Sequence, residues 1–421
     1  MNLPRPGLAA LLLAIFGGGL DAAFAAPKTV MAYYMPWYAA KPTSGAWGWH
    51  WTMDHFNPES VTPLGERNIA SWYYPLIGPY DSADPAALEY HVLLMKLSGI
   101  DGVIVDWYGE DTNFDYGENN QRTAALFGVA RKAGMKFSVS FEDQTIQHLI
   151  DGHFLTTNQA IAHAQEAMLY LQSNYFSDPA FLRWRQKPVL LNFGPQYFKA
   201  NTDWEEIFSV LAASNQPAFF TEDNGLPIGA GAFDWPPMYL SHTPGTGGVL
   251  SAAALENYLG AFDRKAAAWP TFISSAFPRF HDIYQTAGVR DYWGYLGDRN
   301  GNTLRETLSR AMTNGSSIVQ IVTWNDFGEG TVIEPTREYG YRDLGIIQDL
   351  RREYLDSGFA YHTNELGLAL RFFNLRKAAT GNAKAQGVLD AVFTNIATGN
   401  LVEAVSGMSG LESNSIPGAS R

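Results

Sequence analysis

The stretch Ser317-Ile-Val-Gln-Ile-Val-Thr-Trp-Asn-Asp-Phe-Gly-Glu-Gly-Thr331 changes character halfway along its length. Its first half is a β-branched apolar run, which is typical of a strand buried on both faces. Its second half contains tryptophan, asparagine, two carboxylates and two glycines, the chemistry expected where a barrel strand opens into an active site. Asp326 and Glu329 are three residues apart, so a single turn can direct both carboxylates into one cleft.

Upstream of this stretch, shorter apolar runs alternate with helical patterns. The seven runs are residues 29–35, 102–105, 136–141, 188–193, 217–220, 233–238 and 271–276, and the helical patterns are 84–98, 120–133, 158–175, 203–213, 252–268 and 303–313, with 346–355 after the last run. Only the connection between the fifth and sixth runs shows no clear helix. Strands that alternate with helices pair in parallel, so the sequence predicts an α/β fold, a (β/α)8 TIM barrel with long βα loops.

A doubly wound sheet is the competing fold for such a pattern. It requires a Gly-rich phosphate turn after the first strand, and Tyr34-Met-Pro-Trp-Tyr38 is not such a turn. We therefore expect a catalytic barrel over residues 28–360. Two further helical patterns predict C-terminal helices packed on the barrel over 361–410, and residues 411–421 resemble a disordered tail.

The N-terminus predicts export. Arg5 precedes a short apolar run from Leu8 to Leu20, and Ala23-Phe-Ala25 supplies a small-x-small cleavage pattern. Residues 1–25 therefore resemble a secretory signal peptide, because the run is too short for a membrane span; a retained anchor is the alternative. The chain has no cysteine, which excludes disulfides and fits a bacterial periplasmic or secreted protein.

Composition narrows the classes of partner. The net charge is −13, from 29 Lys and Arg against 42 Asp and Glu, so we expect no nucleic acid and, after signal cleavage, no membrane as partner. The 12 Trp, 21 Tyr and 25 Phe include many beside Pro, Gly and polar residues, and exposed aromatic faces suit sugar rings. The histidines lack the spacing of metal ligands, so no metal or other cofactor is expected. Nothing in the sequence indicates an oligomeric state.

Carboxylates follow four of the predicted strands. They are Asp106, Glu142 with Asp143, Glu222 with Asp223, and Asp326 with Glu329. A single acidic strand end is most often a helix cap. Four on one barrel face, mixed with aromatics, instead favour glycosidic bond cleavage, in which one carboxyl protonates the leaving oxygen and another activates or supplies the nucleophile.

Three segments carry a family resemblance. Thr323-Trp-Asn-Asp-Phe-Gly-Glu-Gly-Thr331, continuing to Thr336, resembles the signature of the related glycoside hydrolase families 71 and 99. Tyr33-Tyr-Met-Pro-Trp-Tyr38 is similar to the start of family 99, and Asp101-Gly-Val-Ile-Val-Asp-Trp-Tyr-Gly109 is similar to its second strand. The resemblance implies a barrel that hydrolyses internal α-linkages without a metal.

The same resemblance implies roles for three carboxylates. Family 99 carries Glu-x-x-Glu at this motif and acts on α-mannosides. The second Glu, the general acid/base, corresponds to Glu329. The first, which assists attack by the substrate's own 2-hydroxyl, corresponds to Asp326, and a strand-three carboxylate near that hydroxyl corresponds to Glu142. Aspartate at position 326 is instead similar to family 71, whose members cleave α-1,3-glucan, so α-mannan and α-1,3-glucan both stay open as substrates.

Further residues are candidates for substrate binding. Trp37, Tyr38, Trp107 and Tyr108 could stack on sugars or pack at the barrel mouth. Asn325 could bind a sugar hydroxyl or fix the turn, and Arg279 could contact substrate or pair with a carboxylate. Asp106, Tyr34 and Trp324 complete this set.

Two functions remain at this point. The first is an exported glycoside hydrolase acting on a polysaccharide or oligosaccharide. The second is a weak or inactive glycan-binding barrel. The carboxylates at 326 and 329 favour the enzyme, because binding alone does not need two acids three residues apart.

Overall fold

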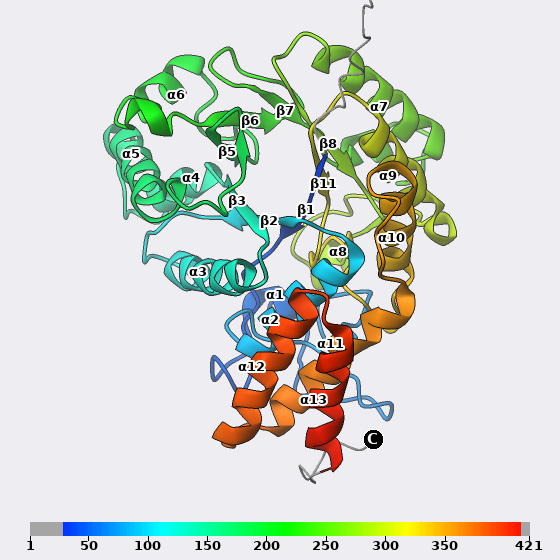
Figure 1. Ribbon diagram of the computed structural model, residues 1–421. Helices are drawn as coiled ribbons and strands as arrows, with labels where there is room; N and C mark the ends of the chain where they lie inside the picture. Colours follow the sequence, from blue (N-terminus) through cyan, green and yellow to red (C-terminus); the bar gives the residue numbers. More distant parts are fainter. Residues whose placement is uncertain (1–27, 414–421) are drawn as a thin grey trace, which may run out of the picture.

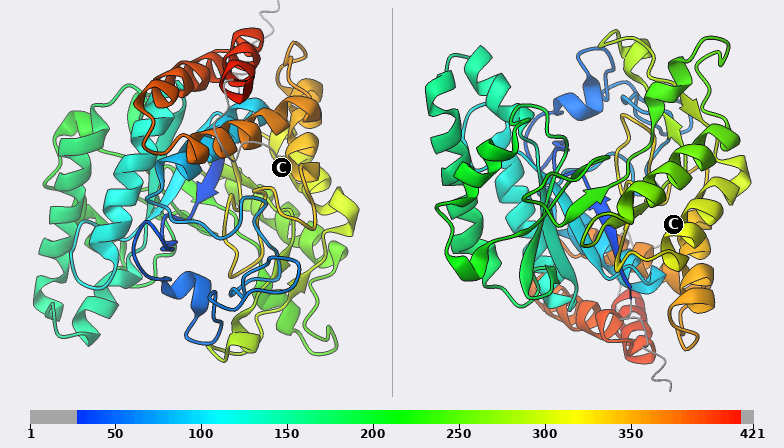
Figure 2. Two further views of the ribbon diagram at one scale, coloured as in Figure 1. Left: turned by 90° about the horizontal axis from the view of Figure 1, so that it is seen from below. Right: turned by 90° about the horizontal axis from the view of Figure 1, so that it is seen from above.

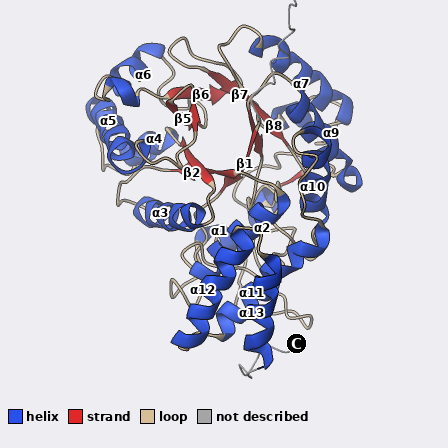
Figure 3. Ribbon diagram, viewed as in Figure 1, coloured by secondary structure: helices blue, strands red, loops and turns tan. Residues whose placement is uncertain are grey.

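The computed structural model describes residues 28–413, and its centre is a closed ring of parallel strands (Figure 3). In ring order the strands are β1 (Thr29–Tyr34), β2 (Gly102–Trp107), β3 (Lys136–Phe141), β5 (Lys187–Asn192), β6 (Ala218–Glu222), β7 (Gly231–Phe233), β8 (Ile273–Ala276) and β11 (Ile318–Ile321). β11 pairs with β1, and the pairing of β3 with β5 completes the ring. The predicted (β/α)8 barrel is confirmed.

Helices surround the ring (Figure 1). They are α2 (Pro85–Ser98), α3 (Tyr116–Lys132), α4 (Gln144–Asp151), α5 (Ala160–Leu171), α6 (Asn201–Phe208), α7 (Ala252–Ala266), α9 (Asn302–Thr313) and α10 (Arg342–Tyr354). The shorter elements are α1 (Trp49–Thr52), α8 (Tyr284–Ala287), β4 (Arg183–Trp184), β9 (Phe280–His281) and β10 (Tyr295–Leu296). As the sequence indicates, no α-helix connects β6 to β7 within the described chain.

The predicted strand at residues 233–238 is wrong in its position. β7 ends at Phe233, because Pro236 and Pro237 lack the N–H donors that continue a ladder. Gly231 permits the close approach of β7 to its neighbour, since a Cβ there would lie 1.9 Å from the carbonyl oxygen of Thr271. Residues 234–237 instead form the loop after β7, and Trp235 and Pro236 of this loop line the cavity described below.

Successive strand residues pack into two separate clusters. Tyr34 of β1 and Trp107 of β2 pack outward with Leu94 of α2 and Phe127 of α3. Tyr33 belongs to the second cluster, which combines side chains from strands all around the ring. This alternation follows from the two-residue period of a strand, and it decides which residues at the strand ends reach the barrel interior.

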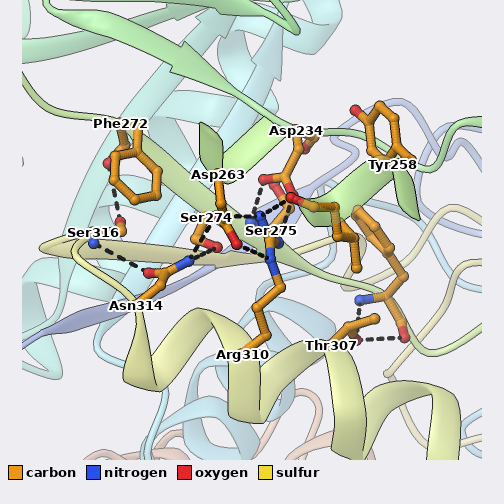
Figure 4. A network of polar contacts seen from close by, with 12 residues as sticks. Asp234, Tyr258, Asp263, Phe272, Ser274, Ser275, Thr307, Arg310, Asn314 and Ser316 are labelled. Atoms are coloured by element: carbon orange, nitrogen blue, oxygen red, sulfur yellow. Dashed lines mark hydrogen bonds and ion pairs between the residues drawn. The ribbon is translucent and has the colours of Figure 1, made fainter. Parts of the chain in front are cut away.

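A partly buried ionic network joins the strands to the helices on one side of the barrel (Figure 4). Arg310 of α9 donates from Nη1 to Asp234 at 2.8 Å and makes two further bonds, of 2.9 and 2.7 Å, to Asp263 of α7. Asp234 is fully buried and accepts the backbone N–H of Ser275 at 2.7 Å. The loop after β7 is thus anchored to both helices.

Three further helices lie outside the ring, all on one side of it (Figure 2). They are α11 (Thr363–Ala378), α12 (Ala383–Ala397) and α13 (Leu401–Ser413). The sequence indicated two helical patterns here, but Gly381 and Gly399 adopt positive φ and separate three. Arg376 of α11 binds Glu89 of α2 at 2.8 Å, which ties this extension to the barrel.

The chain termini extend beyond the described residues. The predicted signal peptide, residues 1–25, lies outside them. Of the predicted tail, residues 411–413 belong to α13, and the remainder lies outside. Within the described part, every helix is too short or too polar to cross a membrane.

Candidate active site

A cavity of about 830 Å³ opens where the barrel strands end, which is the catalytic face of such a fold. We call it the main cavity. The carboxyl groups that line it are Asp106, Glu142, Glu222, Asp326 and Glu329. Two other acids at strand ends do not reach it, because Asp143 accepts the backbone N–H groups of residues 196–198 and Asp223 accepts the hydroxyl of Tyr258.

The turn after β11 places two of these acids side by side. The backbone N–H of Asp326 donates to the hydroxyl of Thr323 at 2.8 Å, and its own Oδ1 accepts the N–H of Glu329 at 2.9 Å. Gly330 follows with φ +68°, and a Cβ there would lie 2.6 Å from the carbonyl oxygen of His281. The turn therefore needs both the short carboxylate and the glycine.

The two acids of the turn have different proton affinities. Burial raises the pKa of Asp326 to about 6, while backbone hydrogen bonds and the Arg290 guanidinium oppose the rise. Burial and then repulsion from the Asp326 carboxylate raise the pKa of Glu329 well above its usual range. Near neutral pH, Glu329 is accordingly the protonated member of the pair and Asp326 the ionised one.

A second carboxyl pair comes from the ends of β2 and β3. The hydroxyl of Tyr33 donates to Asp106 Oδ1 at 2.8 Å, and Gln144 Nε2 donates to Glu142 Oε2 at 2.9 Å. Burial raises the pKa of Asp106 to about 7. Burial and the nearby Asp106 raise the pKa of Glu142 well above its usual range. Repulsion between the two carboxyl groups thus favours protonation of Glu142, and the pair keeps at least one proton near neutral pH.

The loop after β8 supplies the opposite wall. The guanidinium carbon of Arg290 lies 3.8 Å from the ring centre of Tyr284 and 4.4 Å from that of Trp293, which holds the cation between two aromatic faces. Burial raises the pKa of Tyr284 well above its usual range, and the charges of Glu329 and Asp326 add to the rise. The Tyr284 hydroxyl therefore remains a hydrogen-bond donor beside the acids.

Of the residues predicted to bind substrate, four line the main cavity. These are Asp106, Glu142, Trp37 and Tyr108. Their roles toward a substrate remain predictions.

Six other predicted binding residues lie outside the cavity wall. Tyr34 and Trp107 point from the strands toward the helices, where Tyr34 bonds His91 at 3.0 Å and Trp107 bonds Asn120 at 3.0 Å. Trp324 is fully buried in the same layer. The corrections for Tyr34 and Trp107 have one cause, which is that alternate residues of a strand face opposite ways. Trp324 lies beyond the end of β11.

The other three act as structural supports. Tyr38 donates to the carbonyl of Asn325 at 2.9 Å, and Asn325 bonds both backbone groups of Met35, so Asn325 fixes the turn rather than facing the cavity. Arg279 is buried and forms an ion pair with Asp343 of α10. Its guanidinium also lies 3.9 Å from the ring centre of a tyrosine, Tyr339.

Several cavity residues were not predicted from the sequence. Tyr33 and Trp235 pack edge to face at 4.8 Å, and Tyr33 was identifiable by its two-residue offset from the inward Met31 and Met35. Tyr284, at the start of the short helix α8, and Arg290 come from a segment without any periodic pattern, so no local signal marks them. Within residues 28–413, no cluster of three or more His, Asp or Glu residues is placed to hold a metal ion.

Comparison with known proteins agrees with this geometry. The model of glycosyl hydrolase family 99 matches residues 26–230. A mouse glycoprotein endo-α-1,2-mannosidase is 24% identical over 333 residues, covering 72% of this chain and 67% of the relative. A human endo-α-1,2-mannosidase-like protein is 24% identical over 343 residues, covering 73% and 70%.

A solved structure shares the fold. The family 99 endo-α-mannosidase from Bacteroides thetaiotaomicron superposes with a TM-score of 0.55 at 21% identity, covering 78% of this chain and 97% of its own. This likeness shows the shared fold. The match of residues 26–230 to the family model, together with the curated relatives, makes the chain a family 99-like glycoside hydrolase.

Proposed function

We propose that this chain hydrolyses α-mannosidic bonds inside glycan chains, with Glu329 as the proton donor. The observation that carries the proposal is the pair of acids on one turn, Asp326 and Glu329, whose pKa values differ in the direction that acid–base catalysis needs. The choice of α-mannosides rests on the relatives, which are described as endo-α-mannosidases.

The first chemical step breaks the bond between the anomeric carbon and the leaving oxygen. Glu329 transfers its proton to that oxygen as the bond breaks, and the departing sugar leaves as an alcohol. Asp326, ionised above about pH 6, accepts the proton of the attacking hydroxyl. By the family resemblance that hydroxyl is the sugar's own 2-hydroxyl, which would close a three-membered ring with the anomeric carbon.

Water completes the reaction. The Glu329 carboxylate takes a proton from water, the new hydroxyl bonds to the anomeric carbon, and the ring opens as Asp326 returns its proton to the 2-oxygen. Two successive displacements give a product with the starting anomeric configuration. Direct attack of water assisted by Asp326 would instead give inversion.

The second carboxyl pair has a binding role in this scheme. Burial favours a proton on this pair near neutral pH, so Asp106 and Glu142 together can both donate to and accept from sugar hydroxyls. Tyr33 and Gln144 fix the positions of the two carboxyl groups. We expect this pair to orient the sugar ring whose bond is cleaved.

The test is hydrolysis by the purified protein of α-mannan and α-1,3-glucan oligosaccharides, with Glu329→Gln as the variant. We expect cleavage of the mannan series and a loss of about 10²- to 10⁴-fold in kcat on removing the acid. Glu110→Gln is the matched control, because burial raises the pKa of Glu110 to about 7 but its side chain does not line the main cavity. Equal inertness of wild type and Glu329→Gln, with glycan binding intact, would support the binding-barrel alternative.

A 2-deoxy sugar at the reacting position separates the two nucleophiles. The 2-hydroxyl route predicts no turnover of that substrate and retention of configuration in the normal product, followed by NMR. Turnover of the 2-deoxy substrate with inversion would assign the nucleophile to water.

We also infer that the protein is exported, on the strength of residues 1–25. Expression in a Gram-negative bacterium with N-terminal sequencing of the periplasmic protein tests this. A mature chain that begins near Ala26 is expected, and an uncleaved cytoplasmic protein would overturn the inference.

A further inference from the structure

A second cavity of about 390 Å³ lies beside the main one, and we call it the side pocket. Trp37, Trp49 and His50 line both cavities. The rest of the side pocket comes largely from the start of α3 and the residues just before it, which face α1 in the fold (Figure 1). The two cavities thus lie next to each other and share one wall.

The shared wall is a stack of aromatic rings. The rings of Trp37 and His50 lie parallel, with centres 4.1 Å apart and an interplanar angle of 6°, and Trp49 meets His50 edge to face at 5.1 Å. Burial and the nearby Arg122 cation lower the pKa of His50 to about 3, so the imidazole is neutral at any physiological pH. This wall offers flat, uncharged faces on both sides.

Two aromatic side chains of the side pocket are exposed to water. Trp49 is 41% exposed and Phe114 is 54% exposed, although both are large and apolar. Exposed aromatic rings beside a polar cavity are a common surface for the apolar face of a sugar ring. They supply stacking without selecting for charge.

The opposite wall presents polar groups from one face of α3. Glu118 and Arg122 are four residues apart and Asp115 precedes Glu118 by three, so all three point the same way. Arg122 is buried at 7% exposure, and it donates to Asn119 Oδ1 at 3.0 Å and to Ser44 at 3.5 Å. No carboxylate of the described residues lies within ion-pair distance of it, and a guanidinium carries five donors. Arg122 therefore retains donors for a ligand.

We propose that the side pocket binds a neutral sugar residue of the same glycan whose bond is cleaved in the main cavity. Hydroxyl groups both donate and accept, so they match a wall that holds the Arg122 donors and the Asp115 and Glu118 acceptors. A phosphate, sulfate or uronic acid would meet Arg122 but be repelled by the two carboxylates. The nature of the glycan rests on the proposed function; the pocket itself does not.

The consequence is a preference for longer or branched substrates. A substrate too short to reach the side pocket uses the main cavity alone, whereas a longer one gains stacking and hydrogen bonds. Stacking on an aromatic ring contributes about 0.5–1.5 kcal/mol, which corresponds to about 2- to 10-fold in affinity.

The test compares Phe114→Ala with Phe154→Ala. Phe154 is the matched control, because it is 55% exposed and packs edge to face against Phe114 at 5.5 Å but lines neither cavity. Kinetics on α-mannan oligosaccharides of increasing length, with calorimetric binding of the same series, provide the readout. We expect Phe114→Ala to raise KM and Kd about 2- to 10-fold for long substrates only, with kcat unchanged and Phe154→Ala like wild type.

Each outcome decides between the two proposals. Cleavage that shows no difference between Phe114→Ala and Phe154→Ala on long substrates overturns the side pocket while leaving the proposed function intact. Length-dependent binding that Phe114→Ala weakens, without any cleavage, supports the side pocket and overturns the proposed function. Tighter binding of sulfated than of neutral oligosaccharides would overturn the assignment of a neutral sugar.

Discussion

Replacement of Asp326 by asparagine separates two roles that this residue combines. Its Oδ1 accepts the N–H of Glu329 and so shapes the turn, while its charge is the proposed base. Asparagine keeps a side-chain oxygen that can accept the same N–H, and Asn and Asp are nearly equivalent in such positions. We therefore expect the free energy of unfolding to change by less than about 1 kcal/mol.

The activity of Asp326→Asn should fall steeply even though the turn survives. Loss of a general base costs about 10²- to 10⁴-fold in rate, or about 2.7–5.5 kcal/mol in the activation barrier. A second effect follows from the charges, since the Asp326 carboxylate raises the pKa of Glu329. In the variant that repulsion is gone, so Glu329 loses its proton at lower pH and the alkaline limb of the residual activity moves to lower pH.

The assay is the pH dependence of kcat/KM on an α-mannan oligosaccharide, with urea unfolding to verify the fold. Asp111→Asn is the control, because Asp111 Oδ1 likewise accepts a backbone N–H, that of Asn113 at 2.6 Å, but lies away from the main cavity. A folded Asp326→Asn enzyme that keeps more than a tenth of wild-type activity would refute the role of Asp326 as base. In that event the second carboxyl pair becomes the candidate, and Asp106→Asn should then be the inactive variant.

Two further predictions concern charged groups around the site. The Arg290 cation lowers the pKa of both Asp326 and Glu329. Arg290→Gln should therefore raise both pKa values and move both limbs of the pH profile of kcat/KM to higher pH. Limbs that stay in place would show that solvent screens the cation. Arg310→Met leaves the fully buried Asp234 without its cation. In urea titrations this variant should lose about 3–5 kcal/mol of the free energy of unfolding. The added substitution Asp234→Asn should restore part of that free energy. Recovery that fails to occur would contradict the ionic explanation.

Much of the barrel was predictable because its strands are local signals. Each buried strand is a short apolar run that ends abruptly, and the residues just beyond its end converge in a parallel barrel. That rule selects the five carboxylates that line the main cavity, which are Asp106, Glu142, Glu222, Asp326 and Glu329. It also selects Asp143 and Asp223, which do not line it. The position of β7 was predicted wrongly because its three residues are too few to show a two-residue period. The prolines that follow it extend the apolar run, but they cannot donate hydrogen bonds to a neighbouring strand.

The directions of the strand side chains were predicted less well than the strands themselves, although the sequence contains the information needed. If Asp106 faces the barrel interior, Tyr108 does too and Trp107 must face the helices, as observed. The same period selects Tyr33 over Tyr34. Tyr34 and Trp107 were assigned binding roles because they are aromatic, without regard to the two-residue period of a strand. Their packing does not support those roles.

The remaining cavity wall depends on contacts distant in sequence. Arg290 and Trp293 reach the acids through a loop whose course is set by tertiary packing, including the bonds from the Tyr284 and Trp293 backbone N–H groups to Asp282 at 3.1 and 3.0 Å. No pattern in the residues of that loop encodes this path. Loops of this kind carry function without a secondary-structure signal, so they require the structure.

The aspartate at position 326 is best understood from the turn it closes. Its side chain accepts the N–H of Glu329, three residues on, as a cap residue does at the start of a helix. Those backbone donors favour the ionised form of Asp326, whereas no backbone hydrogen bond from residues 28–413 opposes the rise of the Glu329 pKa. One short turn thus assigns the proton to one acid and the charge to the other. A glutamate at 326 would be one methylene longer and would place its carboxylate farther from that N–H, so the spacing and the identity of the first acid together set the division of roles.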